Sequence, residues 1–153
     1  MTVKNNDNPS FVDVRNTKGK SDYRRTIQEI IDAGVCPFCP EHFSWHKNPT
    51  LQNEGDWLVT ASTWPYENAK LHLLIICKSH KENFSELSIQ DFGSLMKLVS
   101  WVSDSYGIEG GGLILRFGST KYTGATVAHL HFHLIVPEID GDGNAMPVWF
   151  PIG

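Results

Sequence analysis

The chain has 153 residues, which is ordinary for one domain and enough to bury a core without a disulfide framework. Hydrophobic residues make up 41% of it and charged residues 20%, a balance typical of soluble globular proteins. The formal net charge of -4 argues against a broad nucleic-acid-binding surface, so no nucleic acid is expected as a partner. A small anionic substrate is compatible with this charge, because local groups can bind phosphate inside an acidic protein.

Residues 1–20 are largely polar, and we expect a flexible N-terminal arm followed by a single domain over residues 21–153. The first residues lack the apolar core of a secretory signal. No apolar run approaches the ~20 residues that a membrane span requires. A cytoplasmic protein without a membrane partner is therefore the expectation.

In the first half, isoleucines at helical spacing predict a helix over residues 21–33, which Gly34 is placed to end. A proline-flanked knuckle is expected at 36–40, and a polar connection at 41–55. Strands are predicted over 56–62 and 71–77, the second of them so apolar that both of its faces should be buried.

In the second half, Ser88 is a natural N-cap for a helix over 88–106 with a clear apolar stripe. A strand at 113–117, a small polar loop at 118–124 and a strand at 127–136 follow, and then a tail rich in glycine and proline. These elements predict an α+β architecture, with an antiparallel central sheet and the helices packed to one side of it.

Histidine alternates with large apolar residues at the start of the last strand, at His129, His131 and His133. Side chains two apart share one face of a strand, so we expect a row of three imidazoles about 6.5–7 Å apart, with the apolar residues packed into a core behind them. Such a row offers metal ligation, proton transfer and nucleophilic attack. Three of the seven histidines in strict alternation favour a functional row over chance.

The three cysteines, Cys36, Cys39 and Cys77, are an odd number that argues against a disulfide scaffold. Cys36 and Cys39 form a CxxC, which suits zinc if two further ligands come from elsewhere. The candidates are the strand histidines and His42, His46, His72 and His80. A redox pair is the alternative, although such a pair usually opens a helix and this one follows a helix.

The small residues and hydroxyls between Gly118 and Thr126, just before the histidine strand, could let main-chain N–H groups approach a phosphate. An ordinary flexible loop is an equally good interpretation. Arg116 and Lys121 could add charge there, although either is more commonly a solvated surface residue.

The run from His129 to Ile135 resembles the signature of the histidine triad (HIT) family, His-φ-His-φ-His-φ-φ. Leu71 to His80 resembles the upstream segment of that family, which carries a histidine, an aliphatic run and Lys-x-His. The resemblance covers roughly residues 35–150. It implies a HIT-like α+β fold, with a central antiparallel sheet of about five strands and two main helices packed on it.

The resemblance implies an enzyme, a hydrolase or nucleotidyltransferase acting on phosphorus anhydride or phosphoramidate bonds. Such enzymes cleave or transfer a nucleoside monophosphate from a dinucleoside polyphosphate, a nucleotide sugar or a nucleoside phosphoramidate. The middle histidine, here His131, is implied to be the nucleophile that carries the nucleotide, and His133 to support it at the phosphate. Nucleotide or phosphate binding is implied for His133, Thr126, His72 and Gly124.

The resemblance also implies a structural Zn²⁺ held by Cys36, Cys39, His80 and His129, and a homodimer by family analogy. The chain departs from the family pattern at Ala125, where many relatives have a phosphate-binding glutamine, and at Leu71, where a glycine is usual. These departures leave open a second interpretation, in which the same fold serves as a non-catalytic nucleotide-binding or interaction module.

Overall fold

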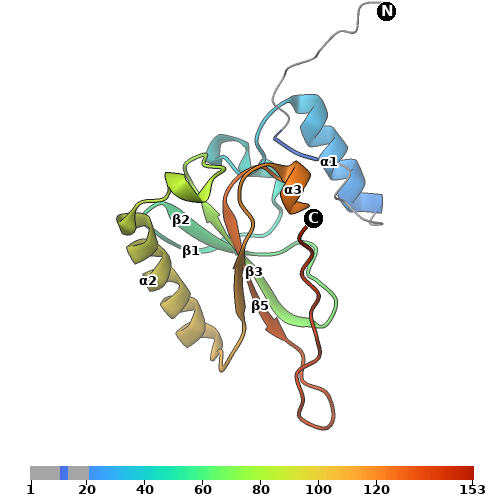
Figure 1. Ribbon diagram of the computed structural model, residues 1–153, viewed down its shortest axis with the longest axis vertical. Coiled ribbons are helices and arrows are strands. Elements are labelled where there is room, and N and C mark those ends of the chain that lie inside the picture. Colours follow the sequence, from blue (N-terminus) through green and yellow to red (C-terminus); the bar gives the residue numbers. More distant parts are fainter. Residues whose placement is uncertain (1–10, 14–20) are drawn as a thin grey trace, which may run out of the picture.

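The structure, a computed structural model, describes residues 11–13 and 21–153 (Figure 1). Most of the expected arm over residues 1–20 therefore lies outside the described residues. Within the described part, Val12 is buried and pairs with Val127 in an isolated antiparallel bridge. In the same part of the chain, no helix has both the length and the apolar character needed to cross a membrane.

The centre of the fold is a five-stranded antiparallel sheet with strand order β1-β2-β3-β5-β4. Its two long inner strands are β3 and β5. The apolar run of β3 is buried on both faces, as predicted, and β5 is buried on both faces as well, including its histidines. The strands are β1 (Thr50–Glu54), β2 (Trp57–Ala61), β3 (Ala69–Cys77), β4 (Gly112–Leu115) and β5 (His131–Pro137). This sheet, with helices packed on it, confirms the predicted α+β fold.

Helix α2 (Ile89–Tyr106) covers one face of the sheet (Figure 1). The Ser88 hydroxyl caps it by accepting a hydrogen bond from the Asp91 backbone N–H, and the Asp91 carboxylate accepts one from the Ser88 backbone N–H. Its apolar stripe meets side chains that alternate along the strands, and together they form the main core. The buried members of this core include Trp57, Val59, Leu73, Ile75, Leu95, Leu98, Val102, Phe132 and Leu134.

Helix α1 (Ser21–Ala33) lies on the opposite side of the sheet from α2, so the expectation that the helices share one side is wrong (Figure 1). The sheet face opposite α2 is also apolar, with Leu58, Leu74 and Ile76 buried on it. Phe38 and Phe43 pack against that face, and Ile27 and Ile30 of α1 line a pocket above it. Both faces are thus covered, with a cavity left on the α1 side.

Strand β5 begins at His131, not at residue 127, so the expected row of three strand histidines is shortened to two. His129 precedes the strand, in a segment whose backbone pairs irregularly: the Leu130 N–H donates to the Lys81 carbonyl and the Leu130 carbonyl accepts from Cys77. Because this segment departs from regular strand geometry, the side chain of His129 need not share a face with that of His131.

Strand β1 lies within the connection predicted at 41–55, where the sequence predicts no strand. It is an edge strand with mostly polar, exposed residues, and therefore lacks the apolar signal that marks a strand in sequence. The same connection begins with the 3-10 helix η2 (Pro40–Trp45), and a second one, η3 (Phe84–Glu86), precedes α2. The loop predicted at 118–124 contains a short helix, α3 (Thr120–Thr123).

Candidate active site and metal centre

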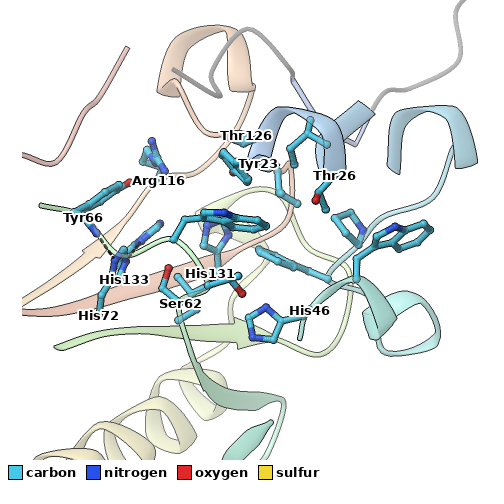
Figure 2. A pocket seen from close by; sticks show the side chains of 18 of the residues that line it. Tyr23, Thr26, His46, Ser62, Tyr66, His72, Arg116, Thr126, His131 and His133 are labelled. Carbon is cyan, nitrogen blue, oxygen red and sulfur yellow. Dashed lines mark hydrogen bonds between the residues drawn. The ribbon is translucent and has the colours of Figure 1, made fainter. Parts of the chain in front are cut away.

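A pocket of about 320 Å³ lies between α1 and the histidine face of the sheet (Figure 2). Its walls come from α1, from β3 and β5, from the loop after α3 and from the C-terminal tail. The lining is mostly aromatic and apolar, which is typical of a small-molecule site. Arg116 and His133 mark one polar end of it, and further polar side chains, Thr26, His46 and Ser62, lie elsewhere in the lining (Figure 2). The polar lining residues include His72, Arg116, Thr126, His131 and His133.

The imidazole ring of His131 is oriented by a hydrogen bond to a backbone carbonyl two residues earlier in the chain. Its Nδ1 lies 2.6 Å from the carbonyl oxygen of His129, and since a carbonyl can only accept, Nδ1 carries the proton and donates it. The other ring nitrogen, Nε2, is then left with a lone pair. Burial lowers the pKa of His131 to about 4, so the ring is neutral at physiological pH.

His133 is oriented by His72, which faces it across the β3–β5 pair. The Tyr66 backbone N–H donates to His72 Nδ1 at 3.2 Å, so the proton of His72 is on Nε2, which donates to His133 Nδ1 at 2.9 Å (Figure 2). His133 must then carry its own proton on Nε2. That atom is buried and has no hydrogen-bond partner, and burial lowers the pKa of His133 well below 6.5. The chain of hydrogen bonds thus ends in a donor without an acceptor.

The loop between α3 and β5 brings Gly124 and Thr126 to the pocket. Gly124 has φ +65°, and a Cβ there would lie 2.8 Å from the carbonyl oxygen of Gly153, so both the backbone conformation and the packed tail require glycine. Thr126 is buried beside Tyr23 of α1 (Figure 2). Burial raises the pKa of Tyr23, and a hydrogen bond with the Thr126 side chain opposes that rise.

Arg116 lines the pocket and is not the solvated surface residue that its type suggested, whereas Lys121 is exposed. Its guanidinium lies over the ring of Phe150, and the same ring contacts His133 edge-on at 4.9 Å. Tyr66 stacks on His133 as well. Sequence patterns give no signal for Tyr23 or Tyr66.

A second cluster brings together Cys36, Cys39, His80 and His129, whose nearest side-chain atoms all lie within 4.8 Å of one another. His129 Nδ1 lies 3.3 Å from Cys36 Sγ and 3.2 Å from His80 Nδ1. Cys39 Sγ lies 3.5 Å from His80 Nδ1 and 3.9 Å from His129 Nδ1. A tetrahedral zinc ion separates sulfur from nitrogen by about 3.5 Å and two nitrogens by about 3.3 Å, so these distances fit one.

The histidine tautomers in this cluster also fit a cation. His129 Nε2 donates to the Cys77 carbonyl at 2.5 Å, and His80 Nε2 donates to the Glu82 carboxylate at 3.1 Å. Both Nδ1 atoms therefore turn lone pairs toward the centre, and outer partners of this kind are usual for histidines that bind a metal. Burial raises the pKa of the Cys39 thiol to about 12, and a bound cation would reverse this by favouring the thiolate.

Among the described residues, His42, His46 and His72 do not belong to this cluster, and of the three alternating histidines only His129 does. His46 instead donates from Nε2 to Thr60 Oγ1 at 2.8 Å, since the Thr60 hydroxyl itself donates to the Pro49 carbonyl. His131 and His133 face the pocket. The seven-residue span from His129 to Ile135 therefore serves two separate centres.

A sequence model described as "HIT domain" matches residues 62–139, half of the chain, and the chain belongs to the HIT domain family. A HIT-like protein of Chlamydia muridarum, described as uncharacterized, is 33% identical over 85 residues, which are 54% of this chain. The chain spans 65% of the length of that relative.

Solved structures share the fold. A histidine triad nucleotide-binding protein of Candida albicans is 20% identical with a TM-score of 0.57, covering 78% of this chain and 85% of its own. A HIT family hydrolase of Clostridium thermocellum is 27% identical with a TM-score of 0.52, covering 69% and 92%. A Zn-bound histidine triad protein of Mycobacterium smegmatis is 18% identical with a TM-score of 0.52, covering 71% and 78%.

Proposed function

We propose that this protein cleaves or transfers a nucleoside monophosphate through a nucleotidyl intermediate on His131. The observation that carries the proposal is the tautomer of His131. Its Nδ1 proton is donated to the His129 carbonyl, so the neutral Nε2 lone pair is available as a nucleophile in a pocket. A neutral imidazole with a lowered pKa needs no separate base to activate it.

In the first step, His131 Nε2 forms a bond to the α-phosphorus, and the phosphorus bond to the leaving group breaks with its electron pair on that group. The unpartnered Nε2–H of His133 would donate to a non-bridging phosphate oxygen, where negative charge develops. Thr126 and the Gly124 loop lie beside the same end of the pocket and are further candidates for phosphate contact. Attack by water on the nucleotidyl-histidine then releases the nucleoside monophosphate, and attack by another acceptor makes the reaction a transfer.

The aromatic residues of the pocket lining suit the nucleoside. Tyr23 and Trp64 lie with ring centroids 4.5 Å apart, and Phe38 packs against His131 at 5.0 Å. Aromatic walls of this kind accept a flat base, because stacking buries its faces while leaving its edge groups free. A pocket of about 320 Å³ is of the size that holds a small ligand.

We further propose that Cys36, Cys39, His80 and His129 hold a structural Zn²⁺. The support is the fit of distances and tautomers, together with the Zn-bound description of the Mycobacterium smegmatis relative. Zinc there would supply charge to stabilise two thiolates and would tie the CxxC and the 78–82 segment to the start of β5. It would fix the position of His131 without touching substrate.

A non-catalytic nucleotide-binding module is the second candidate. Ala125 favours it, because this buried residue has only a methyl group where many members of the family offer a glutamine to phosphate. That candidate predicts nucleotide binding without turnover.

The experiment is a comparison of wild type with His131→Ala on dinucleoside polyphosphates, nucleotide sugars and adenosine phosphoramidate. We expect wild-type turnover on at least one of these classes and a loss of about 10³-fold or more in the variant. Intact-protein mass spectrometry of the quenched wild-type reaction should show an acid-sensitive nucleotidyl adduct. His42→Ala is the control, since His42 lies outside the pocket lining. Full activity in His131→Ala would sink the nucleophile assignment, and binding without turnover in wild type would favour the second candidate.

A further inference from the structure

Arg116, directly after β4, is held in a fixed orientation at the polar end of the pocket. Its Nη1 donates to the carbonyl oxygens of Gly124 and Pro151, both at 3.2 Å. Its guanidinium carbon lies 4.7 Å from the centre of the Phe150 ring, a cation–π distance. A side-chain hydrogen bond also joins the guanidinium to Tyr66, and these contacts together orient it.

Its Nε–H is buried and has no hydrogen-bond partner. Burying a donor without an acceptor costs free energy, so an orphaned Nε–H in a pocket points to a missing acceptor. His133 Nε2 is a second buried donor in the same situation. Both side chains pack against the ring of Phe150, which brings the two unsatisfied donors to the same end of the pocket.

No carboxylate balances the charge of Arg116 among the described residues. None of the pocket-lining residues is an aspartate or glutamate, and no ion pair of Arg116 occurs in the described part of the chain. The neighbouring imidazole of His133 is neutral, and neither it nor that of His131 supplies a negative charge. A fixed cation beside neutral donors, with no internal anion, is suited to an anionic ligand, and a guanidinium matches phosphate oxygens well.

We propose that Arg116 contacts the substrate by donating its Nε–H to a non-bridging oxygen of the phosphate group that His133 also contacts. The identity of that phosphate as part of a nucleotide rests on the proposed function. The contact supplies a charged donor at a site where Ala125, in the adjacent loop, offers only a methyl group. Its two carbonyl anchors keep the guanidinium in place before ligand arrives, so little ordering is needed on binding.

The competing explanation is that Arg116 only fastens the tail and the Gly124 loop through its two carbonyl contacts. The two explanations differ in what they predict for ligands with and without phosphate. A fastening role should weaken a nucleoside and its monophosphate alike, because the whole pocket would loosen. A phosphate contact should weaken only the monophosphate.

The test is isothermal titration calorimetry of AMP against adenosine, and of GMP against guanosine, on wild type, Arg116→Met, Arg116→Lys and Lys121→Met. We expect Arg116→Met to lose about 10- to 100-fold in affinity for the preferred monophosphate, with nucleoside affinity unchanged within about twofold. Arg116→Lys keeps the positive charge but lacks the planar set of guanidinium donors, so its affinity for the monophosphate should lie between those of wild type and Arg116→Met. Lys121→Met removes an exposed cation of the same region and should match wild type. Thermal unfolding and zinc content of each variant check that it is folded.

Equal weakening of monophosphate and nucleoside, in Arg116→Met and in Arg116→Lys, would overturn the proposal in favour of the fastening role. Unchanged affinity for both ligands would overturn it outright. If wild type itself shows no preference for a nucleotide over its nucleoside, the proposed function fails on its own. Titration with inorganic phosphate, followed by ³¹P NMR, then decides the role of Arg116 separately: wild type should bind phosphate and Arg116→Met should not, and equal binding refutes the contact.

Discussion

The Cys–His cluster and the pocket lie at opposite ends of one short segment, and they use the same side chain in opposite ways. In the cluster, His129 and His80 donate from Nε2 and turn Nδ1 lone pairs inward. In the pocket, His131 donates from Nδ1 to the carbonyl of His129, which leaves its lone pair on Nε2. What separates these two histidines is therefore the acceptor that each ring meets, and not the residue type.

The largest expected effect is a difference in bound zinc between variants that lack His129 and variants that lack His131. His129→Ala should lose bound zinc, whereas His131→Ala should keep one equivalent, because only His129 belongs to the cluster. Elemental analysis of the purified variants measures this. Loss of zinc from His131→Ala would mean that the alternating histidines themselves form the metal site, and the two regions would then be one.

Dismantling the cluster should cost stability. Cys36→Ser removes one ligand, and the protein should lose on the order of 4 kcal/mol of unfolding free energy when free zinc stands at about 1,000 times its dissociation constant. Chemical denaturation with and without a strong chelator measures it, and the chelator should destabilise wild type but not the variant. Cys77→Ala is the control: this buried thiol hydrogen-bonds Asp56 and lies outside the cluster, so zinc should be retained. A chelator without effect on wild type contradicts the structural role.

Within the pocket, the orientation of His133 should depend on His72. His72→Leu breaks the hydrogen bond to His133 Nδ1 and should lower kcat about 10- to 100-fold, the size seen for outer partners of functional histidines. His72→Gln places an amide N–H near the position of Nε2 and should restore much of the loss. Steady-state kinetics on the substrate found for wild type provides the measurement. Equal activity in all three proteins would show that the His72 contact is irrelevant to turnover.

The tautomers themselves can be observed. Histidine side-chain ¹⁵N–¹H correlation spectra should show His133 neutral with its proton on Nε2, and the lowered pKa means it should remain so well below pH 6.5. Because the folded-state pKa lies below the unfolded value of about 6.5, His133 contributes stability that is complete above that pH and is lost as the pH falls through the folded pKa. His133→Phe should therefore flatten part of the acid limb of the stability curve. A His133 ring that titrates near 6.5 would contradict this.

The smallest expected effect comes from substituting alanine for one glycine in each of the two regions. Gly34, just before the CxxC, and Gly124, at the pocket, both have positive φ, so alanine should cost each about 1 kcal/mol in strain. Only at Gly124 would the new Cβ also meet the tail, 2.8 Å from the Gly153 oxygen, whereas nothing lies within 4 Å at Gly34. Gly124→Ala should thus weaken ligand binding in addition to stability, and Gly34→Ala should leave binding unchanged. Calorimetric titration and urea unfolding together test the difference.

Much of the fold was predictable because the inner elements carry strong local signals. The continuous apolar run of β3, the capped and striped helix α2 and the alternation along β5 each reflect burial that periodicity records. The edge strand β1 was not predictable, since an exposed edge needs no apolar alternation. The side of the sheet that α1 occupies was not predictable either, because the helix records only that one of its own faces is buried.

The sequence by itself determined the chemistry available: a CxxC, alternating histidines and a Lys-x-His in an order that identifies a family. Tertiary structure alone decided how that chemistry is divided. The irregular pairing before β5 turns His129 toward the cysteines, and the backbone N–H of Tyr66 sets the tautomers of His72 and His133. The tail carbonyl of Pro151 holds Arg116 in the pocket, 35 residues away along the chain. Such partners are distant in sequence and act through backbone atoms that every residue has, so no pattern of residue types could have revealed them.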